Sequence, residues 1–128
     1  MPNYDALHYD PPAPIAEVTL RAANGATVPD VILLLDTGAD ITLLPRSAIV
    51  RLGINPDPAL QYELVGFDGS RSTTQAIDLD MIFLQKVFRG RYLLIDSDRG
   101  ILGRDVLASV ILLLNGPGQE WSQHVPAS

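Results

Sequence analysis

The sequence predicts an all-β fold with one or two short helices. Short apolar runs of strand length recur along the chain, glycine-containing turn signals separate them, and only two segments have the residue pattern of a helix. The chain has 128 residues, of which 47% are hydrophobic and 19% charged. This length and composition predict a single folded domain with a hydrophobic core.

The first half of the chain contains two predicted strands and one predicted helix. The strands, at 15–23 and 28–35, are joined by Asn24-Gly25, a dipeptide that favours a tight hairpin turn with positive φ at both positions. The second strand ends in an apolar run without alternation, which is typical of a strand buried on both faces. A short helix is predicted between Pro45 and Gly53, because proline is favoured at helix starts and glycine just after helix ends.

The second half of the chain begins with a predicted hairpin, formed by 62–67 and 72–83 around Asp68-Gly69. Alternating apolar residues in its second arm predict one buried face. The polar stretch 70–75 predicts that the tip projects from the core, as a lid would.

A further strand is predicted at 87–95, a loop at 98–100, a short helix at 104–109 and a last strand at 110–114. The proline-rich residues 1–14 predict an extended N-terminal arm. The domain proper is predicted over 15–114, and residues 115–128, which begin with Gly-Pro-Gly, are predicted to be a flexible C-terminal tail.

Charge and composition argue against several classes of function. A net charge of −6 with scattered arginines argues against nucleic-acid binding, which needs clustered basic residues. The apolar runs are too short to span a membrane, and the N-terminus lacks the pattern of a signal peptide, so a cytoplasmic location is expected. There is no cysteine, and the two histidines lie near opposite ends of the chain, which argues against nucleophilic catalysis by the usual side chains.

The candidate catalytic residue is Asp36, in the sequence Asp36-Thr37-Gly38 that follows the apolar strand. A strand of this kind would hold the carboxylate on a rigid element, Thr37 could fix the loop through its hydroxyl, and Gly38 leaves space for a close approach. A single carboxylate does little there. Two carboxylates at hydrogen-bonding distance share a proton, and such a pair can activate a water molecule and protonate a substrate oxygen.

Two stretches together resemble the retropepsin-like aspartic proteases, the retroviral type and its cellular and bacterial relatives. They are Leu-Leu-Asp-Thr-Gly-Ala-Asp-Ile-Thr-Leu-Leu at 34–44 and Gly-Ile-Leu-Gly-Arg-Asp-Val-Leu at 100–107. The resemblance covers roughly residues 14–114. It implies a small closed β-barrel with a flap hairpin, and an aspartic endopeptidase that acts on peptide or protein substrates without a cofactor or metal.

The resemblance also implies roles for individual residues. Asp36 would be catalytic, supported in its loop by Thr37, Gly38 and Ala39, with Thr37 bonding to its symmetry mate in a dimer. Asp40 would contact the substrate backbone, as would Gly38, and would form an ion pair with Arg104. The family's flap tip corresponds to further substrate-binding residues, here Val65, Gly66, Phe67, Asp68 and Gly69.

A homodimer follows, because the chain holds one Asp-Thr-Gly and the reaction needs two aspartates. The resemblance implies that two copies of Asp36 meet at a twofold axis. Retroviral members interleave short tails in a dimer sheet. The prolines of the arm and the longer tail of this chain predict a dimer built differently or more weakly.

Two other interpretations stay open at the level of sequence. The chain could keep the fold as a catalytically silent module for dimerisation or peptide binding. Alternatively, Asp36 with Asp40, or Asp96 with Asp98, could provide oxygen ligands for a metal ion.

Overall fold

The computed structural model describes residues 3–66 and 68–126. These residues form mainly strands, with two short helices, and no helix among them is long and apolar enough to cross a membrane. In chain order the elements are β1 (Asn3–Asp5), β2 (Ala13–Arg21), β3 (Thr27–Leu35), β4 (Leu43–Pro45), α1 (Arg46–Leu52), β5 (Gln61–Val65), β6 (Arg71–Phe83), β7 (Lys86–Ile95), β8 (Gly100–Leu102), α2 (Arg104–Leu107), β9 (Leu112–Asn115) and β10 (Glu120–Gln123).

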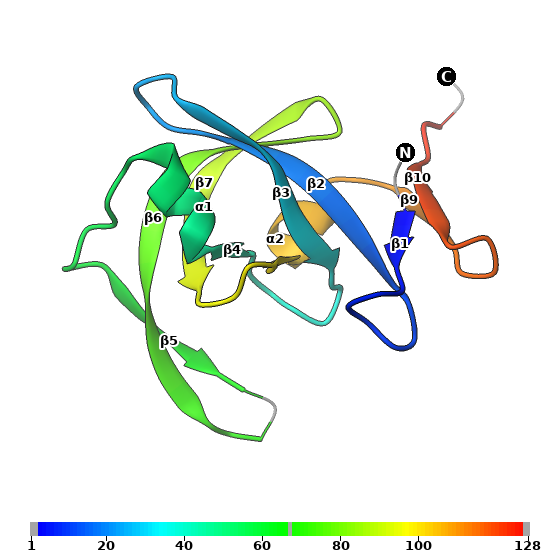
Figure 1. Ribbon diagram of the computed structural model, residues 1–128, viewed down its shortest axis with the longest axis horizontal. Coiled ribbons are helices and arrows are strands. Elements are labelled where there is room, and N and C mark those ends of the chain that lie inside the picture. Colours follow the sequence, from blue (N-terminus) through cyan, green and yellow to red (C-terminus); the bar gives the residue numbers. More distant parts are fainter. Residues whose placement is uncertain (1–2, 67, 127–128) are drawn as a thin grey trace.

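The strands form one sheet that closes on itself (Figure 1). Their order is β5-β6-β7-β4-β8-β3-β2-β1-β10-β9, and an additional pairing of β6 with β2 completes a ring. Most neighbours are antiparallel, but β3 runs parallel to β8 and β4 runs parallel to β7. The predicted small closed barrel is therefore confirmed.

The core fills the ring, and the alternation along β6 explains which face is inside. Ile77, Leu79, Met81 and Phe83 are buried, as the sequence predicts, because successive side chains of a strand point to opposite faces. Helix α1 adds buried apolar residues and ends at Gly53, whose φ of 80° is left-handed, in agreement with the predicted stop.

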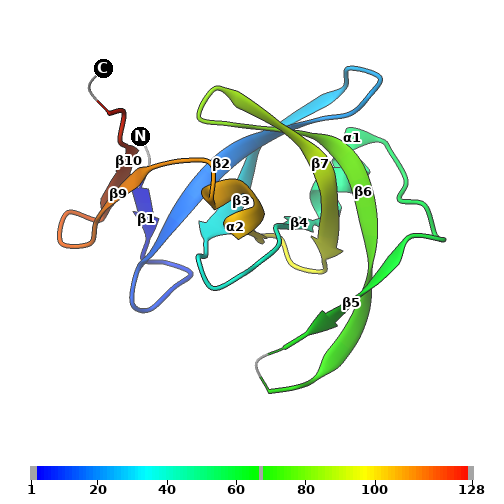
Figure 2. The same cartoon turned by 180° about the vertical axis from the view of Figure 1, so that it is seen from behind.

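The outer part of β6 leaves the body of the protein together with β5. Residues 61–66 and 68–75 belong to this projecting hairpin, in which β6 pairs only with β5, whereas from Ala76 onward β6 pairs with β7. Figures 1 and 2 show the projecting hairpin extending away from the ring in both views. The predicted projecting tip is thus present.

Two turns differ from the sequence prediction. Between β2 and β3 only Gly25 has positive φ, and the Ala22 and Ala26 backbones close a longer loop than a two-residue turn. The tight turn with two positive φ values lies instead at Leu84-Gln85, between β6 and β7. Sequence gives no signal for this turn, because neither residue favours positive φ.

The chain ends differ most from the prediction. Residues 112–123 form a hairpin of β9 and β10 in place of a flexible tail, and β10 pairs with β1, which in turn pairs with β2. Trp121 is buried in this terminal sheet (β1, β10 and β9), where its indole N–H donates to the Ile15 carbonyl at 2.7 Å. One buried aromatic residue with a satisfied N–H holds the segment to the core.

Candidate active site

Asp36 directly follows the last residue of β3, at the edge of the ring of strands. The apolar residues Val31 and Leu33 of β3 are buried, and the strand pairs in parallel with β8. This pairing continues to the aspartate itself, whose backbone N–H donates to the Leu102 carbonyl at 3.1 Å. The position of Asp36 is therefore fixed by two strands of the barrel.

The carboxylate of Asp36 is oriented within its own turn. Its Oδ1 accepts a hydrogen bond from the Gly38 N–H at 2.9 Å, and its carbonyl accepts one from Ala39 at 3.2 Å. A Cβ on Gly38 would lie 3.1 Å from the same Oδ1, so a side chain there would press on the carboxylate. Lack of space, and not an unusual φ, explains the glycine.

The loop from Asp36 to Thr42, called here the Asp36 loop, presents its remaining predicted residues to solvent. Asp36 and Ala39 are partly buried, whereas Thr37, Gly38 and Asp40 are exposed. Asp36 is therefore partly accessible and lies beside three exposed residues of its own loop.

Helix α2 supports the Asp36 loop, but with a different contact from the predicted one. The backbone N–H of Arg104 donates to the Ala39 carbonyl at 2.8 Å, and its guanidinium donates to the Thr37 carbonyl at 2.6 Å. Within the described residues no ion pair joins Arg104 to Asp40. The backbone hydrogen bond to Ala39 fixes the position of Arg104 next to the loop, and from this position its guanidinium binds the Thr37 carbonyl and not the Asp40 carboxylate.

A second support of the loop was missed at the level of sequence. Thr42 is fully buried, and both its backbone N–H and its hydroxyl donate to the Asp105 carboxylate, at 3.0 and 2.7 Å. The same hydroxyl accepts a hydrogen bond from the Gly103 N–H at 3.0 Å. Both partners lie within the two quoted motifs, but nothing in the residue types indicates that a threonine at 42 would meet an aspartate at 105.

The two glycines of the second motif allow its strand to pass close to the Asp36 loop and to β4, which follows it. A Cβ on Gly103 would lie 2.7 Å from the backbone carbon and oxygen of Ile41, and one on Gly100 would overlap the Leu43 carbonyl. Backbone atoms cannot move aside as a flexible side chain can. The spacing of these glycines therefore belongs to the geometry that holds Asp36.

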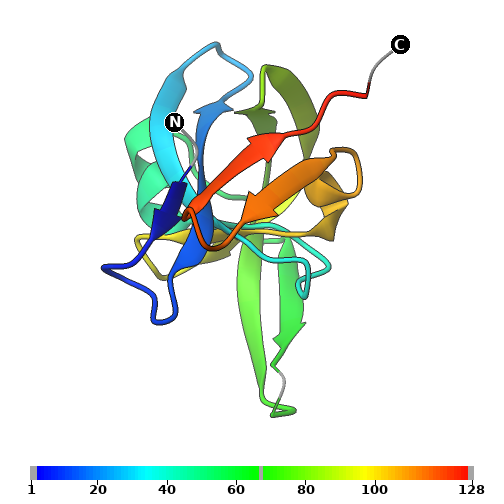
Figure 3. The ribbon, with the colours of Figure 1, turned by 90° about the vertical axis from the view of Figure 1, so that its right-hand side faces the viewer.

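The projecting hairpin carries the other predicted site residues. At its tip the Gly66 N–H donates to the Ser70 carbonyl at 2.8 Å, and the Asp68 carboxylate accepts from the Ser70 N–H at 2.9 Å. Val65, Gly66, Asp68 and Gly69 are exposed, while Phe67 lies outside the described residues. The tip and the Asp36 loop lie toward the same end of the molecule (Figure 3).

Comparisons with known proteins agree with this geometry. Residues 16–106 match a protein family described as aspartyl protease. The chain belongs to the retropepsin-like aspartyl protease family. Among solved structures it is similar to the EIAV protease complexed with the inhibitor HBY-793, with 27% sequence identity and a TM-score of 0.58 over 76% of this chain and 86% of that one. No curated protein matches the chain.

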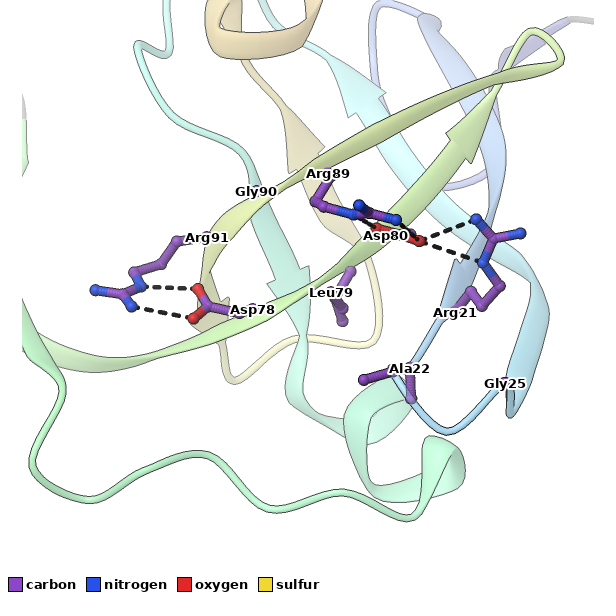
Figure 4. A pocket seen from close by; sticks show the side chains of 10 residues that line it. Arg21, Ala22, Gly25, Asp78, Leu79, Asp80, Arg89, Gly90 and Arg91 are labelled. Carbon is purple, nitrogen blue, oxygen red and sulfur yellow. Dashed lines mark hydrogen bonds and ion pairs between the residues drawn. The ribbon is translucent and has the colours of Figure 1, made fainter.

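A surface hollow of about 900 Å³ lies between the β2-β3 turn and the β6-β7 hairpin (Figure 4), and Asp36 is not among the residues that line it. Its charged residues are paired with one another: Asp80 with Arg21 and Arg89, and Asp78 with Arg91. Hydrogen bonds from Arg89 and Arg21 lower the pKa of Asp80 to about 2, and the Arg91 guanidinium lowers the pKa of Asp78. Both aspartates of the hollow are therefore held in ion pairs with arginines.

Metal binding finds no support in the arrangement of acidic residues. Among the residues that the structure describes, no group of three or more histidine, aspartate or glutamate side chains is placed to hold a metal ion. Asp96 instead accepts a hydrogen bond from Arg46 at 2.7 Å.

Proposed function

We propose that the chain is an aspartic endopeptidase whose catalytic pair of aspartates forms when two copies associate. The observation that carries the proposal is the Asp36 loop. It holds one oriented, partly exposed carboxylate, in a loop supported by β8 and α2, in a chain that belongs to the aspartyl protease family. One chain supplies one such aspartate, so a second copy would complete the pair.

The chemistry follows from two carboxyl groups that share one proton. The ionised carboxylate takes a proton from a water molecule, and the water oxygen attacks the carbonyl carbon of the peptide bond. The protonated carboxyl donates its proton to the carbonyl oxygen. The carboxyl that took the water proton then donates it to the amide nitrogen, while the other, now ionised, carboxylate accepts a proton from one of the two hydroxyls on the former carbonyl carbon. The C–N bond breaks, an amine and a carboxylic acid leave, and the two carboxyl groups again share one proton.

The exposed residues around Asp36 are suited to hold the peptide. Gly38 and Asp40 lie beside the aspartate and could contact the substrate backbone. The projecting hairpin would close over the substrate as a flap. Most side chains at 61–65 and 71–73 are exposed, so few contacts with the body of the protein would have to break when it moves. Exclusion of water by such a closure strengthens the hydrogen bonds to the reacting groups.

The test is digestion of a peptide library by wild type and Asp36→Asn at mildly acidic and neutral pH, over a range of enzyme concentrations. We expect cleavage by wild type only, with a rate per enzyme that falls on dilution because the dimer dissociates. Asp98→Asn, which replaces an exposed aspartate of the 96–98 loop, serves as the matched control and should cleave like wild type.

Cleavage that survives Asp36→Asn would show that another residue or a contaminant is responsible. No cleavage at any concentration, together with dimerisation or peptide binding unaffected by Asp36→Asn, would identify the chain as a silent module.

A further inference from the structure

Three segments that are far apart in the sequence line the surface hollow beside the β2-β3 turn. Its lining residues come from the end of β2 and the turn (21–23 and 25), from β6 (78–80) and from β7 (89–91). The volume of about 900 Å³ lies within the range of roughly 300–1,000 Å³ that is typical of small-molecule sites. The chemistry proposed at Asp36 uses none of these residues.

The charges that line the hollow do not balance. Three arginines and two aspartates line it, which leaves one positive charge in excess. Arg91 pairs with Asp78 at 2.8 Å, so these two side chains neutralise one another. Asp80, by contrast, accepts from two arginines, from Arg21 at 2.9 Å and from Arg89 at 2.8 Å. The excess charge therefore lies at the end of the hollow formed by Arg21, Asp80 and Arg89.

The two arginines at this end keep hydrogen-bond donors that the ion pairs do not use. Arg21 donates to Asp80 through Nε and Nη2, and Arg89 donates through the same two nitrogens. Within the part of the chain that the structure describes, the Nη1 group of neither arginine makes a hydrogen bond. Both side chains reach solvent, since Arg21 is 37% exposed and Arg89 is 81% exposed. Each can therefore bind an anion without releasing the aspartate.

The rest of the lining is apolar. Leu79 lies between the two ion-paired groups in Figure 4, on the strand that carries both aspartates. Gly90, which lies opposite Leu79 in the register of β6 and β7, adds no polar side chain. Ala22 and Ala23 line the hollow from the side of the β2-β3 turn. A bound molecule would thus meet positive charge at one end and apolar groups beside it.

We propose that the hollow binds a carboxylate that is attached to an apolar group. The carboxylate would accept charge-assisted hydrogen bonds from Arg21 and Arg89, and the apolar group would lie against Leu79 and the two alanines. Charge complementarity favours an anion here, although a net charge of −6 repels anions from most of the surface. One excess positive charge matches one carboxylate, whereas a phosphate monoester brings nearly two negative charges.

NMR titration with hydrocinnamate, a carboxylate on a phenylethyl group, tests the site. We expect saturable shift changes at 21–25, 78–80 and 89–91, with a dissociation constant on the order of 1 mM for a ligand of this size. The uncharged amide of the same compound is the matched ligand, and it should bind about tenfold more weakly because it lacks the charge. Equal binding of acid and amide would overturn the proposal, as would shift changes that do not saturate or that spread over the other arginines.

Two pairs of variants test the role of charge. Arg89→Gln should weaken hydrocinnamate binding several-fold, because it removes the excess positive charge. Arg71→Gln is the matched control, since Arg71 is 74% exposed and pairs with one carboxylate, that of Glu63, on the projecting hairpin. Equal affinity of these two variants would overturn the proposal.

Ala23→Glu tests the same point without removal of an arginine, because it adds a carboxylate at an exposed position that lines the hollow. It should also weaken binding several-fold. Ala6→Glu, at an exposed position between β1 and β2, is its control and should bind like wild type. A folded Ala23→Glu variant with the affinity of Ala6→Glu would contradict the proposed position of the carboxylate.

A carboxylate on an apolar group occurs both on free organic acids and at the C-terminus of a peptide. The same titration with acetyl-Ala-Phe, in the Asp36→Asn variant so that no cleavage interferes, distinguishes these sources. Tighter binding of the peptide than of hydrocinnamate would support the site with a peptide end as its ligand, and weaker binding would support it with a free acid. Binding of neither compound would overturn the proposal. These outcomes are independent of whether the wild type cleaves peptides.

Discussion

The Asp36 loop and the projecting hairpin are anchored in opposite ways. The loop is held by the backbone and side chain of Arg104, by the Thr42 and Asp105 contacts, and by the close crossing of Gly103. Most of the hairpin is exposed, and it pairs with nothing beyond its own two strands until Ala76. The contrast shows that the body of the protein holds the loop at several points, whereas it holds the hairpin only at its base.

The largest effect is expected from Gly103→Ala. The added methyl group would lie 2.7 Å from the Ile41 backbone, which cannot yield without displacing the Asp36 loop. We expect a loss of about 3 kcal/mol of unfolding free energy, measured by urea denaturation. Gly116→Ala is the control, because nothing lies within 4 Å of a Cβ at that position. Equal stability of the two variants would mean that the loop yields readily and is not rigid.

Thr42→Val should have the next largest effect. Valine has nearly the same shape, but it leaves the buried Gly103 N–H without its acceptor and removes the hydroxyl bond to Asp105. A loss of about 2 kcal/mol is expected. A double-mutant cycle with Asp105→Ala should show strong coupling, and additive losses would indicate that the two residues act independently.

Arg46→Ala should affect the hairpin and leave the loop unchanged. Arg46 donates to Gln75, at the base of the hairpin, at 2.6 Å and to Asp96 at 2.7 Å. The global stability should change by less than about 1 kcal/mol, because the ion pair is partly exposed. Hydrogen exchange of residues 61–75 should become several-fold faster.

Arg71→Ala is the control for this measurement, because Arg71 pairs with Glu63 further out, where both side chains are more than half exposed. If both variants exchange alike, Arg46 does not hold the base of the hairpin.

The smallest effect concerns the inner half of β6 and depends on pH. Asp80 has a pKa of about 2 in the folded protein, lowered from 3.8 by Arg89 and Arg21. A carboxyl with a lowered pKa stabilises the folded state above pH 4, and this contribution disappears as the pH falls from about 4 to 2. The stability difference between wild type and Asp80→Asn should therefore be constant near neutral pH and shrink in that acidic range.

NMR titration of the Asp80 carboxyl tests directly whether its ion pairs with arginine lower its pKa. Arg89→Gln should raise the pKa of Asp80, because it removes the strongest hydrogen bond to the carboxylate. An Asp80 that titrates equally in wild type and Arg89→Gln would contradict the ion pairs as the cause.

The mainly β content and the strand before Asp36 could be predicted from residue patterns because these depend on local sequence, whereas the closed barrel was implied only by the family resemblance. Alternation along 77–83 predicts the buried face of β6, and the apolar run before Asp36 predicts a buried strand. These signals lie within a few consecutive residues. The family resemblance then connected the two motifs of the site.

The parts that could not be predicted depend on contacts between distant residues. The partner of Arg104 is decided by where its backbone meets Ala39, and the Thr42 contact to Asp105 by the crossing of two strands. The terminal hairpin was missed because Gly116-Pro117-Gly118 is typical of a flexible segment. The burial of Trp121 against the core outweighs that local preference.

Trp121 is the only tryptophan of the chain, and it lies on β10, which pairs with β9, beside Phe83 at a ring distance of 5.9 Å. Its emission therefore reports on one place, the junction between the terminal sheet and the core. The protein carries an intrinsic optical probe, with which docking of the terminal sheet on the core can be followed in real time without a label.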